Sequence, residues 1–159
     1  MPAAHRMLAE SQISGIHVTN DPTRSGYMIK SKEILLSAAS NPETIVHEYA
    51  HALERALHVY QDPEFLRIRA KGLENIRPGD IIQDETTFTE PVYRVENPKL
   101  ISEYQGVLYP SYGIYDGKRV SLDGMREYFS EGYREFIYRP AQLREVDPEL
   151  YHYIEGLIR

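Results

Sequence analysis

The sequence predicts a single α+β domain, with a small N-terminal sheet and an amphipathic helix followed by a mainly helical C-terminal part. Strand patterns come first along the chain and helical patterns dominate later. The chain has 159 residues, which is enough for one compact core. It contains no fixed-period repeat and no low-complexity tract. We therefore expect residues 1–159 to form one domain.

Composition and charge exclude several classes of function. A formal net charge of −6 argues against a nucleic-acid-binding protein, which normally presents a basic face. The apolar runs are short, so no membrane span is expected. With no cysteine in the chain, any metal must be bound by histidine and carboxylate side chains. No apolar signal segment follows the first methionine, which leaves open a cytoplasmic protein or one secreted or delivered into a target cell by separate machinery.

Four elements are expected before the first long helix. They are a short helix at residues 1–12, a strand at 13–19, and extended segments at 25–31 and 32–37. The last of these segments carries an apolar run, namely Ile34, Leu35 and Leu36.

The first long helix is predicted from its cap and its periodicity. Either Ser40 caps it with Glu43 in a capping box, or Asn41 caps it with Pro42 in the first turn. Asn41 is favoured because a residue before proline avoids the helical region. The helix is expected to run to about residue 59, with one apolar stripe: Val46, Ala50, Leu53 and Leu57.

The later part of the chain is predicted to be irregular at first and then helical. Residues 76–98 contain four proline or glycine residues and are interpreted as an irregular insert. The other expected elements are a helix at 63–73, short strands at 99–108 and 119–122, a helix at 123–138 and a final helix from residue 147.

The segment His-Glu-Tyr-Ala-His at residues 47–51 indicates a metal site on the first long helix. His47 and His51 lie four residues apart, so they project from one face and can reach one cation. Glu48 points near the same site and can hold the water that zinc acidifies. The alternative is a helix with two exposed histidines beside a salt-bridging glutamate, but the motif's position on a capped amphipathic helix favours the metal.

Two further polar residues follow on the same helix. Glu54 lies one turn beyond His51, where it could orient that histidine or could be a solvated helix charge. Both interpretations remain open. His58 lies roughly 16 Å from His47 along the axis, so it cannot join the same metal and is expected at the surface.

A third metal ligand must come from elsewhere in the chain, because catalytic zinc takes three protein ligands and keeps one position for water. The only histidine after His58 is His152, which does not fit a short-spaced third-histidine pattern. Glu127 and Glu131 lie four apart on an aromatic-rich helix. One can ligate zinc while the other hydrogen-bonds a histidine. The alternative is a pair of solvated glutamates on the outer face.

These segments resemble a known family. Residues 44–54, Thr-Ile-Val-His-Glu-Tyr-Ala-His-Ala-Leu-Glu, resemble the active-site helix of the zincin-like catalytic domain of anthrax lethal factor, which clostridial Pro-Pro endopeptidases share. Residues 127–133, Glu-Tyr-Phe-Ser-Glu-Gly-Tyr, are similar to the family's second signature, and residues 148–158 to its closing helix. The similar parts run from about residue 13 to the C-terminus.

The resemblance implies a zincin-like fold with one Zn²⁺ ion. By this resemblance His47, His51 and Glu127 would ligate zinc, Glu48 would be the general base and Glu131 would support the ligands.

The resemblance also implies a tyrosine whose hydroxyl steadies the oxyanion. The family's usual spacing falls on Val120 here, so this sequence departs from the pattern. Tyr112 and Tyr115 are the nearest candidates, since an inserted hairpin could carry either into place. Tyr112 is the first choice because its neighbours match the family better.

These expectations together describe a zinc-dependent endopeptidase, acting as a monomer on a protein or peptide substrate. The substrate is expected to pair with an edge strand around Ile34, Leu35 and Leu36. Two alternatives stand beside it: a catalytically inert zinc-containing binding module, and an intracellular regulatory peptidase of another zincin clan.

Overall fold

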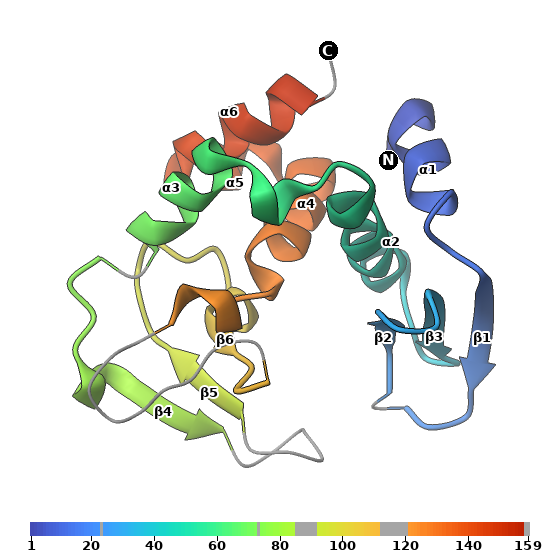
Figure 1. Ribbon diagram of the computed structural model, residues 1–159, viewed down its shortest axis with the longest axis horizontal. Coiled ribbons are helices and arrows are strands. Elements are labelled where there is room, and N and C mark those ends of the chain that lie inside the picture. The colour runs from blue at the N-terminus through green and yellow to red at the C-terminus, as the bar shows by residue number, and fades with distance from the viewer. Residues whose placement is uncertain (23, 73, 85–91, 112–120, 158–159) are drawn as a thin grey trace.

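The computed structural model describes residues 1–22, 24–72, 74–84, 92–111 and 121–157, and the fold is α+β as the sequence predicts (Figure 1). The helices are α1 (Ala3–Glu10), α2 (Pro42–Ala56), α3 (Pro63–Lys71), α4 (Glu127–Tyr138), α5 (Pro140–Val146) and α6 (Pro148–Leu157). The strands are β1 (Gly15–Thr19), β2 (Gly26–Met28), β3 (Glu33–Ser37), β4 (Ile81–Asp84), β5 (Val92–Val95) and β6 (Val107–Leu108). Short 3₁₀ turns are η1 (Val59–Gln61), η2 (Pro78–Asp80), η3 (Tyr104–Gly106) and η4 (Leu122–Gly124).

The first sheet has the strand order β1-β3-β2, with β3 in the middle. Strand β3 pairs in parallel with β1 and antiparallel with β2, and its Ile34 is fully buried. The expectation that Ile34, Leu35 and Leu36 form an open edge for substrate is therefore wrong, because both sides of this strand are already paired. The edge nearer α4 in Figure 1 belongs instead to β2.

Helix α2 begins as the sequence predicts and ends earlier. The Asn41 side chain caps it by accepting a hydrogen bond of 2.9 Å from the Thr44 backbone N–H, and Pro42 occupies the first turn. The helix ends at Ala56 rather than near residue 59. His58 takes a left-handed conformation with φ of 53°, which stops the helix before η1.

A second sheet has the order β4-β5-β6, and its first two strands lie in residues 76–98, which were predicted to be irregular. Val92 and Val95 of β5 are buried, so this sheet contributes to the core. The expected strand at 99–108 shrinks to its last two residues. Before them the Ser102 and Gln105 side chains bond to backbone N–H groups at 3.1 and 2.7 Å, which favours a turn over a strand.

The C-terminal part is helical, with boundaries that differ from the prediction. Helix α4 begins at Glu127 rather than near residue 123. Residues 122–124 form the separate short turn η4, which the Ser121 side chain caps. Pro140 opens α5, a helix that the sequence did not predict, and Asp147 caps α6 by accepting from the Leu150 N–H at 3.0 Å. Three rings on α4 are buried at the centre of the core, namely Tyr128, Phe129 and Tyr133. Burying each contributes about 1.5–3 kcal/mol, which fixes α4 against its neighbours.

No helix within the described part of the chain combines the length and the apolar character needed to cross a bilayer.

Candidate metal centre

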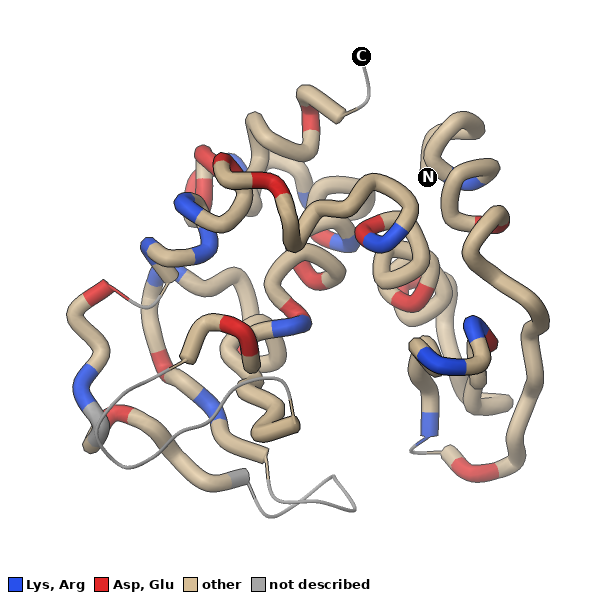
Figure 2. Tube along the Cα trace, viewed as in Figure 1, with Lys and Arg blue, Asp and Glu red and all other residues tan. Residues whose placement is uncertain are grey.

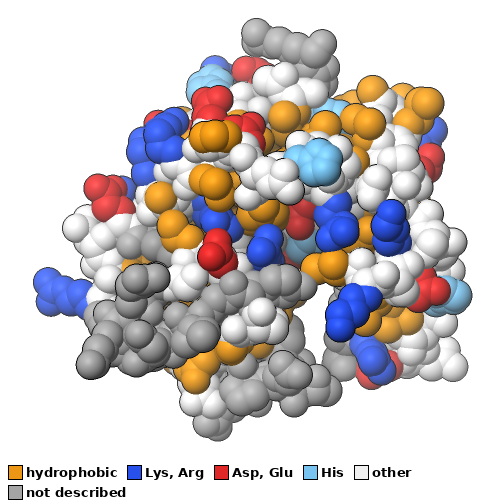
Figure 3. All heavy atoms as spheres, in the orientation of Figure 1, with side chains coloured by type: hydrophobic (Ala, Val, Ile, Leu, Met, Phe, Trp, Pro, Cys, Tyr) orange, Lys and Arg blue, Asp and Glu red, His pale blue; other side chains and the backbone are white. Residues whose placement is uncertain are grey.

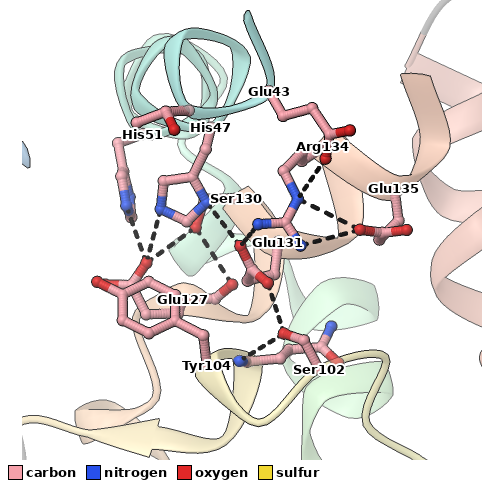
Figure 4. Close-up of polar contacts among 12 residues, drawn as sticks. Glu43, His47, His51, Ser102, Tyr104, Glu127, Ser130, Glu131, Arg134 and Glu135 are labelled. Atoms are coloured by element: carbon pink, nitrogen blue, oxygen red, sulfur yellow. Dashed lines mark hydrogen bonds and ion pairs between the residues drawn. The ribbon is translucent and has the colours of Figure 1, made fainter. Parts of the chain in front are cut away.

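Helices α2 and α4 lie side by side, and their facing side chains bring three potential metal ligands together (Figures 1 and 4). His47 and His51 project from α2 toward Glu127, the first residue of α4. The Nε2 atoms of His47 and His51 lie 3.1 and 3.0 Å from the same oxygen, Oε2 of Glu127. One ligand atom from each residue lies within 4.8 Å of the other two, so the group could hold a metal ion.

The spacing of these atoms fits a small tetrahedral cation. Zinc–nitrogen and zinc–oxygen bonds of about 2.0–2.1 Å place two ligands of a tetrahedron roughly 3.3 Å apart. The 3.0 and 3.1 Å separations here are hydrogen-bond lengths, and a small cation could replace these contacts after a shift of a few tenths of an ångström. Two imidazole nitrogens and one carboxylate oxygen also form a donor set that zinc accepts.

Glu131 lies behind His47, one helical turn after Glu127. Its Oε1 atom is 2.9 Å from Nδ1 of His47, in ion-pair contact rather than in a well-aligned hydrogen bond. The carboxylate is fully buried, accepts a hydrogen bond from the Ser102 hydroxyl and pairs with Arg134 at 2.8 Å. By holding Nδ1 of His47, Glu131 turns Nε2 toward Glu127.

A chain of ion pairs continues from this carboxylate across the two helices (Figure 4). Arg134 also contacts Glu135 at 2.9 Å, and Glu135 pairs with Arg139 at 2.6 Å. Arg139 donates to both oxygens of Glu43 at 2.9 and 2.7 Å. Because Glu43 lies in the first turn of α2, the chain ties the start of α2 to the end of α4 and fixes the two ligand-bearing helices together.

Two polar residues further along the chain, one on α2 and one just beyond its end, have different environments. Glu54 is buried and lies 3.5 Å from Nδ1 of His51, so it is not a solvated helix charge. His58 lies at the rim of the cleft described below and is not part of the ligand group.

The carboxylate of Glu48 lies beside the ligands without joining them. It is buried, and its Oε2 atom has no hydrogen-bond partner among the described residues. Burial raises the pKa of Glu48, while His47, His51 and the backbone N–H of Tyr27 partly offset that rise. A buried carboxylate with a raised pKa and an oxygen without a hydrogen-bond partner can accept a proton from a water molecule bound beside it.

The charges at the centre are mutually stabilised. Desolvation lowers the pKa of His47, but the close contacts of its two ring nitrogens with the carboxylates of Glu127 and Glu131 outweigh that effect and raise the pKa to about 9. The pKa of His51 is likewise raised, mainly by Glu127 against its burial. Burial raises the pKa of Glu127, but the two histidines outweigh it and hold the value well below its usual range. Without a metal ion these shifts favour protonated histidines beside an ionised Glu127, and a cation bound by the same atoms would take the place of the histidine protons.

Two tyrosines that the sequence reasoning did not select lie at this centre. The Tyr109 hydroxyl donates to Oε1 of Glu127 at 2.9 Å, and the Tyr104 hydroxyl is 3.2 Å from that of Tyr109. The ring of Tyr104 lies 5.7 Å from that of His47 (Figure 4). Burial raises the pKa of both phenols, so both are neutral donors near pH 7.

The tyrosines selected from the family spacing, Tyr112 and Tyr115, lie outside the described residues. Nothing in the sequence distinguishes Tyr104 and Tyr109 from the other eleven of its thirteen tyrosines. The family spacing counts back from Glu127 along the chain, and the turn at η3 with strand β6 brings the two rings to the site from further upstream.

The metal centre opens into a cleft of about 680 Å³. A second hollow of about 280 Å³ adjoins the same residues, and both are lined by His47, Glu48 and Tyr104. Strand β2 borders the larger one with Gly26 and Tyr27. The ligand group therefore borders both hollows, and the larger one lies along the edge strand β2.

Comparison with known protein families, with curated proteins and with solved structures gives no match for this chain.

Proposed function

We propose that this protein is a zinc-dependent endopeptidase with a zincin-like fold, resembling the catalytic domain of lethal factor-like peptidases. One observation carries the proposal. His47, His51 and Glu127 converge on one point from two helices, and the unpaired oxygen of Glu48 lies beside them in an open cleft. A purely structural zinc site would be closed by a fourth protein ligand, whereas a catalytic site keeps a position for water.

The metal is proposed to be Zn²⁺, held by His47, His51 and Glu127. Zinc would supply a Lewis acid that polarises the scissile carbonyl and acidifies the attacking water.

Glu48 is proposed to act as general base. Its carboxylate accepts the proton of the attacking water and later delivers it to the leaving amine. The raised pKa of Glu48, caused mainly by its burial, suits a group that must both take up and release a proton.

Tyr104 is proposed to donate a hydrogen bond to the oxyanion, in place of Tyr112 and Tyr115. It lines both halves of the cleft, whereas the Tyr109 hydroxyl is already bonded to Glu127. An oxyanion donor of this kind contributes roughly 10²–10³-fold to kcat.

The substrate is proposed to lie extended along β2. This strand pairs on one side with β3 and borders the cleft with Gly26 and Tyr27. Backbone pairing along such an edge positions a peptide without regard to most of its side chains, and the two hollows beside the ligand group leave room for chain beyond the scissile bond.

N-terminal profiling of a proteome digested with the zinc-loaded protein tests the proposal. The wild type is expected to generate new N-termini, and Glu48→Gln is expected to generate none while still binding one zinc per chain. Bound zinc without any cleavage by the wild type would contradict the peptidase and favour a binding module. Cleavage by Glu48→Gln at the wild-type rate would contradict the assigned base.

The two tyrosines are tested separately. Tyr104→Phe is expected to lower kcat by roughly 10²-fold with little change in KM, because it removes a hydrogen bond made in the transition state. Tyr109→Phe is expected to alter zinc affinity more than Tyr104→Phe does, because it removes a hydrogen bond from a ligand. A Tyr104→Phe variant with wild-type kcat would show that Tyr104 is not the donor of the hydrogen bond to the oxyanion.

A further inference from the structure

The two ligand-bearing helices meet differently at their two ends. At one end the ion-pair chain through Arg139 joins the start of α2 to the end of α4. At the other end the cleft separates them, lined by Arg55 from the end of α2 and by Glu127 from the start of α4. Figure 3 shows this cleft as a hollow with Lys and Arg side chains on both sides. Because the cleft interrupts direct packing there, another contact must fix the start of α4.

The start of α4 has no side-chain cap of its own. Arg126 occupies the cap position, and its side chain makes no capping hydrogen bond. Without such a cap the first turn of a helix is less firmly held. The first residue of α4 is nevertheless Glu127, the candidate ligand whose oxygen must meet both histidines. Its position therefore depends on contacts from other segments.

Tyr60 of the short turn η1 supplies such a contact. Its hydroxyl donates to the backbone carbonyl of Arg126 at 2.7 Å and lies 3.4 Å from that of Met125. These two residues directly precede Glu127. Burial raises the pKa of the phenol, so the hydroxyl keeps its proton and remains a donor. Since η1 follows α2 closely in the chain, this hydrogen bond joins the end of α2 to the start of α4.

The ring of Tyr60 is held by side chains from two other segments. The guanidinium groups of Arg126 and Arg69 lie 4.6 and 5.0 Å from its centroid, and the ring of Phe65 meets it edge-on at 5.2 Å. Figure 2 shows the basic positions on α3 and at the start of α4. Arg69 is buried, and its Nε and Nη1 atoms have no hydrogen-bond partner among the described residues. Burying such a cation is costly unless it is compensated, and its contact with the ring provides part of the compensation.

A left-handed residue directs the chain to this position. Helix α2 ends at Ala56, and His58 adopts φ of 53° and ψ of 36° two residues before Tyr60. Few residues other than glycine, asparagine and aspartate adopt this conformation readily, and uncommon backbone conformations cluster at functional sites. Here it ends the helix and starts η1, so that Tyr60 lies beside the start of α4 instead of continuing along the axis of α2.

We propose that Tyr60 is a positioning residue for the metal site, which holds the start of α4 so that Glu127 meets His47 and His51. The inference rests on the metal site of the proposed peptidase. Tyr60 acts through the backbone of the residue before the ligand and does not bind the metal itself. Its loss should leave all three ligands present but less well placed, which lowers the metal affinity and changes the coordination geometry.

Tyr60→Phe tests the proposal, because it keeps the ring and removes only the hydroxyl. The zinc Kd, measured by competition with a chromophoric chelator, is expected to rise about 3- to 10-fold, the effect of one hydrogen bond. The visible absorption spectrum of the Co²⁺-loaded protein reports the coordination geometry and is expected to differ from that of the wild type.

Tyr133→Phe is the matched control. Tyr133 is also on α4, and its hydroxyl bonds at 2.7 Å to His5 on α1, away from the ligand group. Both variants lose one hydroxyl hydrogen bond, so similar decreases in melting temperature are expected. The control should change the zinc Kd by a much smaller factor and leave the Co²⁺ spectrum as in the wild type.

Variants of His58 test the turn that places Tyr60. Asparagine adopts the left-handed conformation more readily than most residues, whereas a β-branched valine strongly disfavours it. His58→Asn is therefore expected to keep the zinc Kd close to the wild-type value, and His58→Val to raise it as Tyr60→Phe does. In the double variant with Tyr60→Phe, His58→Val should add little, because both changes act on the same contact.

These measurements need no cleavage, so they separate this inference from the proposed activity. Equal changes in zinc Kd for Tyr60→Phe and Tyr133→Phe, or no change in either, would overturn the inference. If circular dichroism shows that Tyr60→Phe does not fold, the two His58 variants decide the question, and equal zinc Kd values for them would overturn it. A wild type that binds no zinc would contradict the proposed metal centre and this inference together.

Discussion

Replacing Glu131 with glutamine is expected to weaken zinc binding without removing a ligand. The Glu131 carboxylate is fully buried and lies 2.9 Å from Nδ1 of His47, where its charge orients the ring and raises the basicity of Nε2. Glutamine keeps the shape and removes the charge. Loss of such an outer partner lowers metal affinity about 10- to 100-fold. That corresponds to about 1.4–2.7 kcal/mol of binding free energy.

The assay is a competition titration of zinc against a chromophoric chelator near neutral pH. Glu135→Gln is the matched control, because Glu135 is also buried on α4 and also pairs with Arg134, at 2.9 Å. Its described partners are the arginines of the ion-pair chain rather than a ligand histidine. The control is therefore expected to lower the melting temperature and to raise the zinc Kd by a much smaller factor than Glu131→Gln does.

Equal zinc Kd values for Glu131→Gln, Glu135→Gln and the wild type would refute this reasoning. Circular dichroism of the zinc-free proteins shows whether Glu131→Gln still folds. If it does not, Ser102→Ala provides a milder test, since it removes only a hydroxyl that donates to Glu131. This variant is expected to weaken zinc binding by a smaller factor.

Three further predictions concern stability and are measured by urea or thermal unfolding. A methyl group at Gly132 would lie 2.4 Å from Cδ2 of the fully buried Leu150, so Gly132→Ala should destabilise by roughly 1–3 kcal/mol. Gly156→Ala meets open space and should stabilise by up to about 1 kcal/mol, and equal effects would contradict the packing of α4 on α6. Burial raises the pKa of Glu135, but hydrogen bonds, first from Arg139, outweigh burial and lower the pKa below its ordinary 4.5. The ionised Glu135 side chain therefore stabilises the fold fully above about pH 4.5, and this stabilisation is lost as the pH falls through the lower pKa of the folded state. The stability difference between wild type and Glu135→Gln should therefore shrink below about pH 4.5, and a constant difference would refute the linkage. Removing zinc from a solution at 100 times Kd should cost about 2.7 kcal/mol, or roughly 5–10 °C in melting temperature, and an unchanged melting temperature would contradict a site in the folded state.

Local signals in the sequence predicted the helix that carries the motif. The cap at Asn41, the proline after it and the apolar stripe through Ala50 and Leu53 all act within a few residues of one another, and all are present in the structure. The end of the same helix was placed too late. A left-handed residue at His58 has no clear local signature, because histidine adopts this conformation only where its surroundings favour it.

The second sheet was not predicted from the sequence, for a different reason. Its strands are short, and its first two flank residues 85–91 in a stretch rich in proline and glycine, which favoured an irregular segment. Pairing between β5 and β6 joins residues that are far apart in the chain, such as Arg94 and Val107. Periodicity within one segment cannot reveal such a partner.

The sequence alone determined a capped helix with two histidines and a glutamate on one face, and a second helix with two candidate carboxylates. Both follow from the 3.6-residue period and from caps, which are local properties. Only the tertiary structure decided that Glu127, which lies 76 residues after His51 in the sequence, faces both histidines. It also decided that Glu131 lies behind His47. It also decided that β2 rather than β3 is the strand edge bordering the cleft, and that Tyr104 and Tyr109 reach the metal centre. These choices depend on how helices and strands pack around a shared core, which no single segment of the sequence contains.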